Sequence, residues 1–79
     1  METMKIQILG TGCAKCNKLE ANVRSAINEK GIEAQIEKVT EMDKIVALGV
    51  MITPALIIDG SIISSGKVLP KEEVLKHLV

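Results

Sequence analysis

The sequence predicts a single α/β domain whose elements follow the order β-α-β-α-β-β-α. Apolar residues near the N-terminus alternate with a period of two, which is typical of a strand. From residue 13 onward they recur with the period of a helix. An Asp59-Gly60 pair between two apolar runs indicates a hairpin turn. We therefore expect one domain over residues 1–79, with a four-stranded mixed sheet flanked by helices.

The first half of the chain predicts a strand, a long helix and a second strand. Residues 4–9 alternate as a strand does, and the glycine-rich segment that follows ends it. The helix begins near Cys13 and ends at Lys30 and Gly31, since a glycine commonly follows the last turn. Residues 34–39 predict the second strand. A helix joins the two strands, so they should be parallel through a right-handed crossover.

A short helix and a hairpin are predicted next. The helix lies between Thr40 and Gly49, and Thr40 with Asp43 resembles a weak capping box. Residues 55–58 and 61–64 should pair as an antiparallel hairpin.

The last helix should have Pro70 at its first helical position, where the missing N–H of proline costs nothing. Its buried face should consist of Val74, Leu75 and Leu78. Aromatic residues are absent, so aliphatic residues must form the core. We expect Met42 and Met51 to fill it, although Met51 lies close enough to Thr53 to line a substrate groove instead.

Charge and composition exclude several classes of partner. Ten basic and ten acidic residues cancel, so no long-range field attracts nucleic acid or an anionic membrane. No apolar run approaches the length of a membrane span. The N-terminal residues lead directly into the first strand without an apolar signal region. We therefore expect a cytoplasmic monomer that binds neither nucleic acid nor membrane.

The two cysteines, Cys13 and Cys16, carry the chemistry that we expect. A disulfide between them closes a loop too small to stabilise the fold much, so a catalytic, redox-sensing or metal-binding pair is favoured. Amide groups at the helix start, together with Lys15, should lower the pKa of the Cys13 thiol. We expect Cys13 to attack a substrate disulfide and Cys16, the more buried thiol, to resolve the mixed disulfide. Gly10 and Gly12 should allow unusual backbone angles and leave the thiol open.

Metal binding through the same two thiolates is the main alternative. A structural zinc site needs four ligands, and this chain has no third cysteine and a single distant histidine, His77. Two thiolates suit soft ions such as monovalent copper, but the final helix does not fit small heavy-metal-binding domains. A third possibility is a domain that only docks partners. We expect no bound metal or cofactor.

Several motifs in order resemble the thioredoxin-like superfamily, and in particular its glutaredoxin-sized archaeal and bacterial redox-active disulfide proteins. The motifs are Gly-Thr-Gly-Cys13-Ala-Lys-Cys16, Thr53-Pro54, Asp59-Gly60 and Gly66, and they span almost the whole chain. The resemblance implies a thiol-disulfide oxidoreductase of the thioredoxin or glutaredoxin kind, which takes electrons from a reductase and reduces protein or small-molecule disulfides. It also implies a cis bond before Pro54 and pairing of the Thr53 backbone with bound peptide. Gly12 and Lys15 would help to position the substrate.

The sequence departs from this family in several places, and it lacks the Trp that thioredoxins usually have before the first cysteine. Ala14-Lys15 separates the cysteines, where thioredoxins have Gly-Pro and glutaredoxins Pro-Tyr. Gln7 lies near the position of the buried acid of thioredoxins, and an amide cannot accept a proton in its place. Ser64-Ser65-Gly66 lacks the residues with which glutaredoxins bind glutathione. The resemblance therefore leaves the substrate and the electron donor open.

Overall fold

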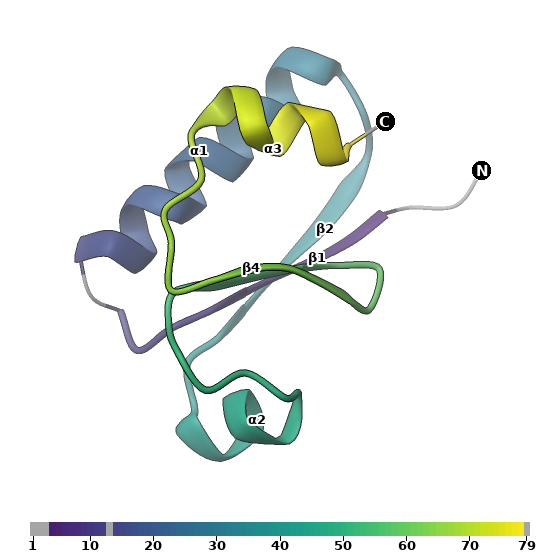
Figure 1. Cartoon of the computed structure of the whole chain (residues 1–79). Coiled ribbons are helices and arrows are strands. Elements are labelled where there is room, and N and C mark those ends of the chain that lie inside the picture. Colours follow the sequence, from purple (N-terminus) through teal and green to yellow (C-terminus); the bar gives the residue numbers. More distant parts are fainter. Residues whose placement is uncertain (1–3, 13, 79) are drawn as a thin grey trace.

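The computed structural model describes residues 4–12 and 14–78, and its elements follow the expected order (Figure 1). The elements are β1 (Met4–Leu9), α1 (Ala14–Lys30), β2 (Ala34–Val39), α2 (Met42–Ala47), β3 (Ala55–Ile58), β4 (Ser61–Ser65) and α3 (Lys71–His77). Within the described ranges, no helix is both long enough and apolar enough to cross a membrane.

The four strands form one mixed sheet in the order β2-β1-β3-β4. β1 and β2 are parallel, as the helical crossover predicts, while β1–β3 and β3–β4 are antiparallel. Figure 1 shows α1 and α3 together on one face of the sheet and α2 on the other, near one end. The α/β fold expected from the sequence is confirmed.

The hairpin between β3 and β4 is formed by the expected two-residue turn. Asp59 has φ 49° and Gly60 has φ 85°, the left-handed angles that this type of turn requires. The N–H of Asp59 donates to the Lys5 carbonyl at 2.8 Å, and the Lys5 N–H donates to Asp59 Oδ1 at 2.9 Å. The turn is thereby attached to the start of β1.

Apolar residues form two clusters, one on each face of the sheet. Alternation along β1 and β3 sends successive side chains to opposite faces. The larger cluster, under α1 and α3, contains Ile6, Ile8, Leu19, Val23, Ala26, Leu56, Ile58, Val74 and Leu78. The smaller cluster, on the face that α2 covers, contains Leu9, Val39, Ile45, Val50, Ala55 and Ile57.

Three local expectations are wrong. The N-cap of α2 is Glu41 and not Thr40, and no side chain caps this helix; its place is set by Ile45, which is buried in the smaller cluster. Pro70 is the N-cap of α3 and not its first helical residue, because its ψ of 163° is extended. Met42 and Met51 are exposed over 55% and 84% of their surface, and Ile45 and Val50 are the residues of this segment that are buried in the core.

Candidate active site

The candidate site lies where the C-terminal end of β1 meets the N-terminal end of β3. Leu9 pairs with Ala55, so the next residues, Gly10 and Pro54, leave the sheet next to each other. The Gly10 N–H donates to the carbonyl of Val39, the last residue of β2, at 2.9 Å. One end of the sheet thus brings together the loop before α1 and the loop before β3.

Cys16 lies in the first turn of α1 and is buried, with only 5% of its surface exposed. Its Sγ lies against Gly10: a Cβ at residue 10 would overlap this sulfur and approach the Cys16 Cβ to 3.0 Å. The expectation that Gly10 provides an unusual backbone angle is wrong, because its φ is outside the left-handed region. Gly10 serves instead to let the sulfur approach the backbone closely, a contact that no local sequence pattern predicts.

Cys13, the expected nucleophile, lies outside the described residues, so its role stays a prediction. Gly12, just before it, has φ 89° in open space, in keeping with the unusual angle expected there. Just after it, Ala14 and Lys15 are exposed in the first turn of α1. Lys15 therefore presents its charge to solvent beside the loop, and its influence on Cys13 stays a prediction.

Thr53 and Pro54 form the second part of the site. Their peptide bond is cis, as the family resemblance implied, and Pro54 is fully buried. Thr53 is half-buried, and neither its N–H nor its C=O bonds to any residue that the structure describes. Its backbone is therefore available to an extended peptide, which is how a strand is added to an unpaired edge.

Gly66 supports this loop from behind, a contact that the sequence did not reveal. Its N–H donates to the Pro54 carbonyl at 2.7 Å, and its φ is 75°. A Cβ at residue 66 would come within 2.7 Å of Ile52 Cγ2. Only glycine allows both the left-handed angle and this close contact.

Gln7 lies on the opposite face of the sheet from Cys16, which belongs to α1. Its Nε2 donates to Glu37 Oε1 at 2.8 Å on the neighbouring strand. Both lie on the sheet face opposite α1, since Gln7 alternates with Ile6 and Ile8, which pack beneath that helix. Gln7 thus joins β1 to β2.

Glu20 lies on α1 one turn after Cys16. Its carboxylate binds Lys38 of β2 at 3.0 Å and Arg24 at 2.9 Å. The hydrogen bond from Lys38, followed by that from Arg24, lowers the pKa of Glu20 below its usual value. This network fixes α1 to the edge strand of the sheet.

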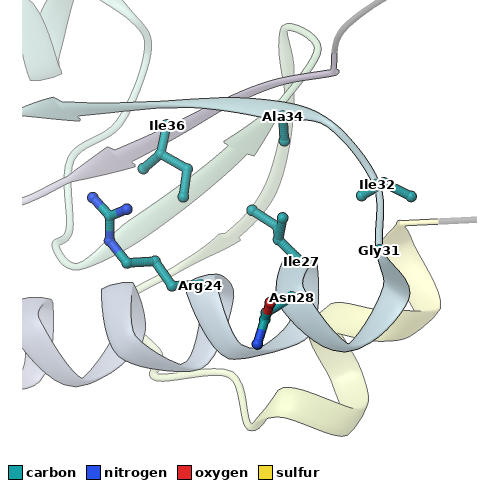
Figure 2. A pocket seen from close by; sticks show the side chains of 7 residues that line it. All are labelled: Arg24, Ile27, Asn28, Gly31, Ile32, Ala34 and Ile36. Carbon is teal, nitrogen blue, oxygen red and sulfur yellow. The ribbon is translucent and has the colours of Figure 1, made fainter.

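A pocket of about 440 Å³ lies at the other end of α1 and does not belong to the candidate site. Figure 2 shows Ile27 pointing from α1 toward β2, with Arg24 extending alongside Ile36. Cys16 is eleven residues before Ile27 on the same helix, a rise of about 16 Å. Across the described ranges, no group of three or more His, Cys, Asp or Glu side chains is placed to hold a metal ion.

Comparison with known proteins gives one consistent result. Residues 4–79 match a family model described as a thioredoxin domain. The chain is 51% identical over 75 residues to a thioredoxin of Methanothermobacter thermautotrophicus, covering 95% of this chain and 97% of that protein. It is 44% identical over 73 residues to a thioredoxin of Methanocaldococcus jannaschii, covering 92% and 84% of the two chains.

Proposed function

This chain belongs to the thioredoxin domain family of thiol-disulfide oxidoreductases, and we propose that it works through a reversible disulfide between Cys13 and Cys16. The observation that carries the proposal is the buried Cys16 sulfur, held against Gly10 at the start of α1. Burial protects the Cys16 thiol from oxidants in solution. Cys13 is the one other cysteine of the sequence, three residues away, with which it can form a disulfide. Neither relative's name points to the alternative of soft-metal binding.

The reaction consists of two thiol-disulfide exchanges. The Cys13 thiolate attacks one sulfur of the substrate disulfide, which forms a mixed disulfide and releases the other sulfur as a thiolate. The Cys16 thiolate then attacks the Cys13 sulfur and releases the second substrate thiolate. The substrate gains two electrons and two protons, and the protein holds the Cys13–Cys16 disulfide. A dithiol reductase returns the pair to its reduced form.

The substrate segment would lie across Thr53. The N–H and C=O of this residue, which bond to no described residue, can pair with an extended peptide and hold its disulfide beside the loop that contains Cys13. Gly12 leaves this loop open, and Lys15 would lower the pKa of the Cys13 thiol. Exposed Met51 and Ile52, which come just before Thr53, favour protein disulfides as substrates.

The remaining expectations concern the state in which the protein works. We propose that residues 1–79 act as one domain and as a monomer, which sedimentation equilibrium over a range of concentrations tests. We also propose that the reaction takes place in the cytoplasm, where a reductase can keep the pair reduced.

The test begins with the reduction potential of the pair, measured by equilibration with glutathione and with dithiothreitol. A single two-electron transition between about −200 and −300 mV is expected, as for other cytosolic reductases. If no disulfide forms within one chain, the proposal is overturned, and titration with monovalent copper then examines metal binding.

The roles of the two cysteines are tested by trapping. The Cys16→Ser variant should accumulate a mixed disulfide with a protein substrate, because nothing resolves it. The Cys13→Ser variant should accumulate none. Ala14→Ser is the matched control, since it adds the same hydroxyl at an exposed position between the cysteines and leaves both thiols in place. Equal trapping by both cysteine variants would contradict the assignment of roles.

A further inference from the structure

The large apolar side chains that are exposed in the described part of the chain all come from α2, the connection that follows it, and β4. We call this set the α2 apolar patch; it consists of Met42, Val46, Leu48, Met51, Ile52 and Ile62. The connection from α2 to β3 lies along β4, because Ile62 Cδ1 is 4.0 Å from the Cβ position of Gly49. At its other end, Ile52 lies against Gly66, which bonds to Pro54. The patch therefore runs up to the loop of the candidate active site.

Met51 is the most exposed member of this patch, with 84% of its surface open to solvent. It lies two residues before Thr53, where the substrate backbone would pair. Flexible methionine side chains are favoured at surfaces that bind many partners, because they adapt to different shapes. An exposed thioether beside a redox site is also accessible to peroxide.

We propose that Met51 is a site of reversible oxidation, and that its sulfoxide weakens the binding of protein substrates. This inference rests on the proposed reductase function. Hydrogen peroxide transfers one oxygen to the thioether: the O–O bond breaks, a sulfur–oxygen bond forms, and water leaves. The sulfur loses the two electrons that peroxide gains. The sulfoxide is polar, so an apolar substrate side chain loses a favourable contact.

Two substrates separate this effect from damage to the cysteines. The protein is first converted to its Cys13–Cys16 disulfide, which protects the thiols, then treated with hydrogen peroxide and finally reduced with dithiothreitol. Dithiothreitol restores thiols from disulfides, whereas sulfoxides need a methionine sulfoxide reductase. The readouts are kcat/KM for the disulfides of insulin and for hydroxyethyl disulfide, a small molecule that does not extend to Met51. Mass spectrometry locates the added oxygen.

After peroxide, kcat/KM for insulin should fall by about threefold to tenfold, which corresponds to the loss of one apolar contact. The value for hydroxyethyl disulfide should hold, and methionine sulfoxide reductases A and B together should restore the insulin value. Met51→Leu should resist the loss, with each variant compared to its own untreated activity. Met42→Leu is the matched control, because Met42 is also exposed but lies twelve residues from Pro54; it should lose activity as the unchanged protein does.

The outcomes are distinguishable. If the untreated protein reduces neither substrate, the proposed function is overturned, and this inference with it. If it reduces both, and Met51→Leu loses as much insulin activity as the unchanged protein, the inference alone is overturned. Met51→Gln gives an independent check: its polar side chain of similar length should lower kcat/KM for insulin without peroxide, and an unchanged value would contradict the proposal.

Discussion

The sulfur of Cys16 occupies the space that a Cβ at residue 10 would need, so Gly10 and Cys16 form one structural unit. Gly10 follows the last residue of β1 and bonds through its N–H to Val39, while Cys16 belongs to the first turn of α1. The position of the buried thiol relative to the sheet therefore depends on the absence of a single methyl group.

Gly10→Ala should displace the Cys16 sulfur. The added methyl overlaps Sγ, and overpacking of this kind costs about 1–3 kcal/mol of unfolding free energy. Because the resolving thiol moves, the mixed disulfide with substrate should persist longer than in the unchanged protein. Urea unfolding measures the first effect, and quenched-flow trapping of the mixed disulfide measures the second.

Gly31→Ala is the control for this substitution. Gly31 has φ 70° with open space around its Cβ position, so the change costs backbone strain of about 1–2 kcal/mol far from the cysteines. This variant should lower the free energy of unfolding without slowing the attack of Cys16 on the mixed disulfide. If Gly10→Ala resolves the mixed disulfide at the normal rate, the close contact has no role in the reaction.

The sequence predicted the strands and helices well because their signals are local. Alternation along β1, the helical period of α1 and the Asp59-Gly60 turn each depend on neighbouring residues, and all three are confirmed. The N-caps of α2 and α3 lie one residue after the positions that the sequence predicts. No side chain caps either helix, so tertiary packing determines where each begins.

The contacts that build the site could not be predicted in this way. The contact between Gly10 and Cys16 and the contact between Gly66 and Ile52 join separate segments of the chain, and no periodic pattern in the sequence predicts them. Met51 shows the same limit: its apolar character suggested a core residue, but Val50 occupies the buried position beside it. The family resemblance supplied the cis bond before Pro54, which composition alone would not have indicated.

Gly66 and Ile52 should show energetic coupling. Gly66→Ala adds a methyl 2.7 Å from Ile52 Cγ2 and forces a left-handed angle on alanine, so it should cost about 2–4 kcal/mol. Ile52→Ala removes the atom that clashes. When Ile52 is already Ala, Gly66→Ala should therefore cost only the backbone strain of about 1–2 kcal/mol. A double-mutant cycle by urea unfolding measures the coupling, and strictly additive effects would show that the clash is relieved elsewhere.

Ser64→Ala should stabilise the protein. The Ser64 hydroxyl is buried and has no hydrogen-bond partner among the described residues, so folding removes it from water without compensation. Removing it should raise the unfolding free energy by about 1 kcal/mol. Ser65→Ala is a close control, because Ser65 is the next residue of β4 but is exposed. Equal effects of the two substitutions would mean that the Ser64 hydroxyl carries no desolvation penalty.

Glu20 should make stability depend on pH in the acid range. Lys38 and Arg24 lower its pKa in the folded state, so the folded protein keeps this carboxylate ionised at a pH where the unfolded chain takes up a proton. The contribution is complete above the ordinary glutamate pKa of about 4.3 and is lost as the pH falls through the lowered value. Because both cations are about half exposed to solvent, which screens their charge, the contribution should stay below about 1 kcal/mol.

The Glu20→Gln variant isolates this contribution. Its unfolding free energy should lie below that of the unchanged protein at pH 7, and the two should converge as the pH falls below about 4, because the unchanged protein then loses its ion pairs. The difference in unfolding free energy between the two proteins at pH 7 should also become smaller in 1 M salt, because salt screens exposed ion pairs. Glu33→Gln, at an exposed glutamate with no ion pair to another described residue, should show no such convergence. A constant gap between Glu20→Gln and the unchanged protein from pH 7 to pH 3 would show that Glu20 acts through packing and not through its charge.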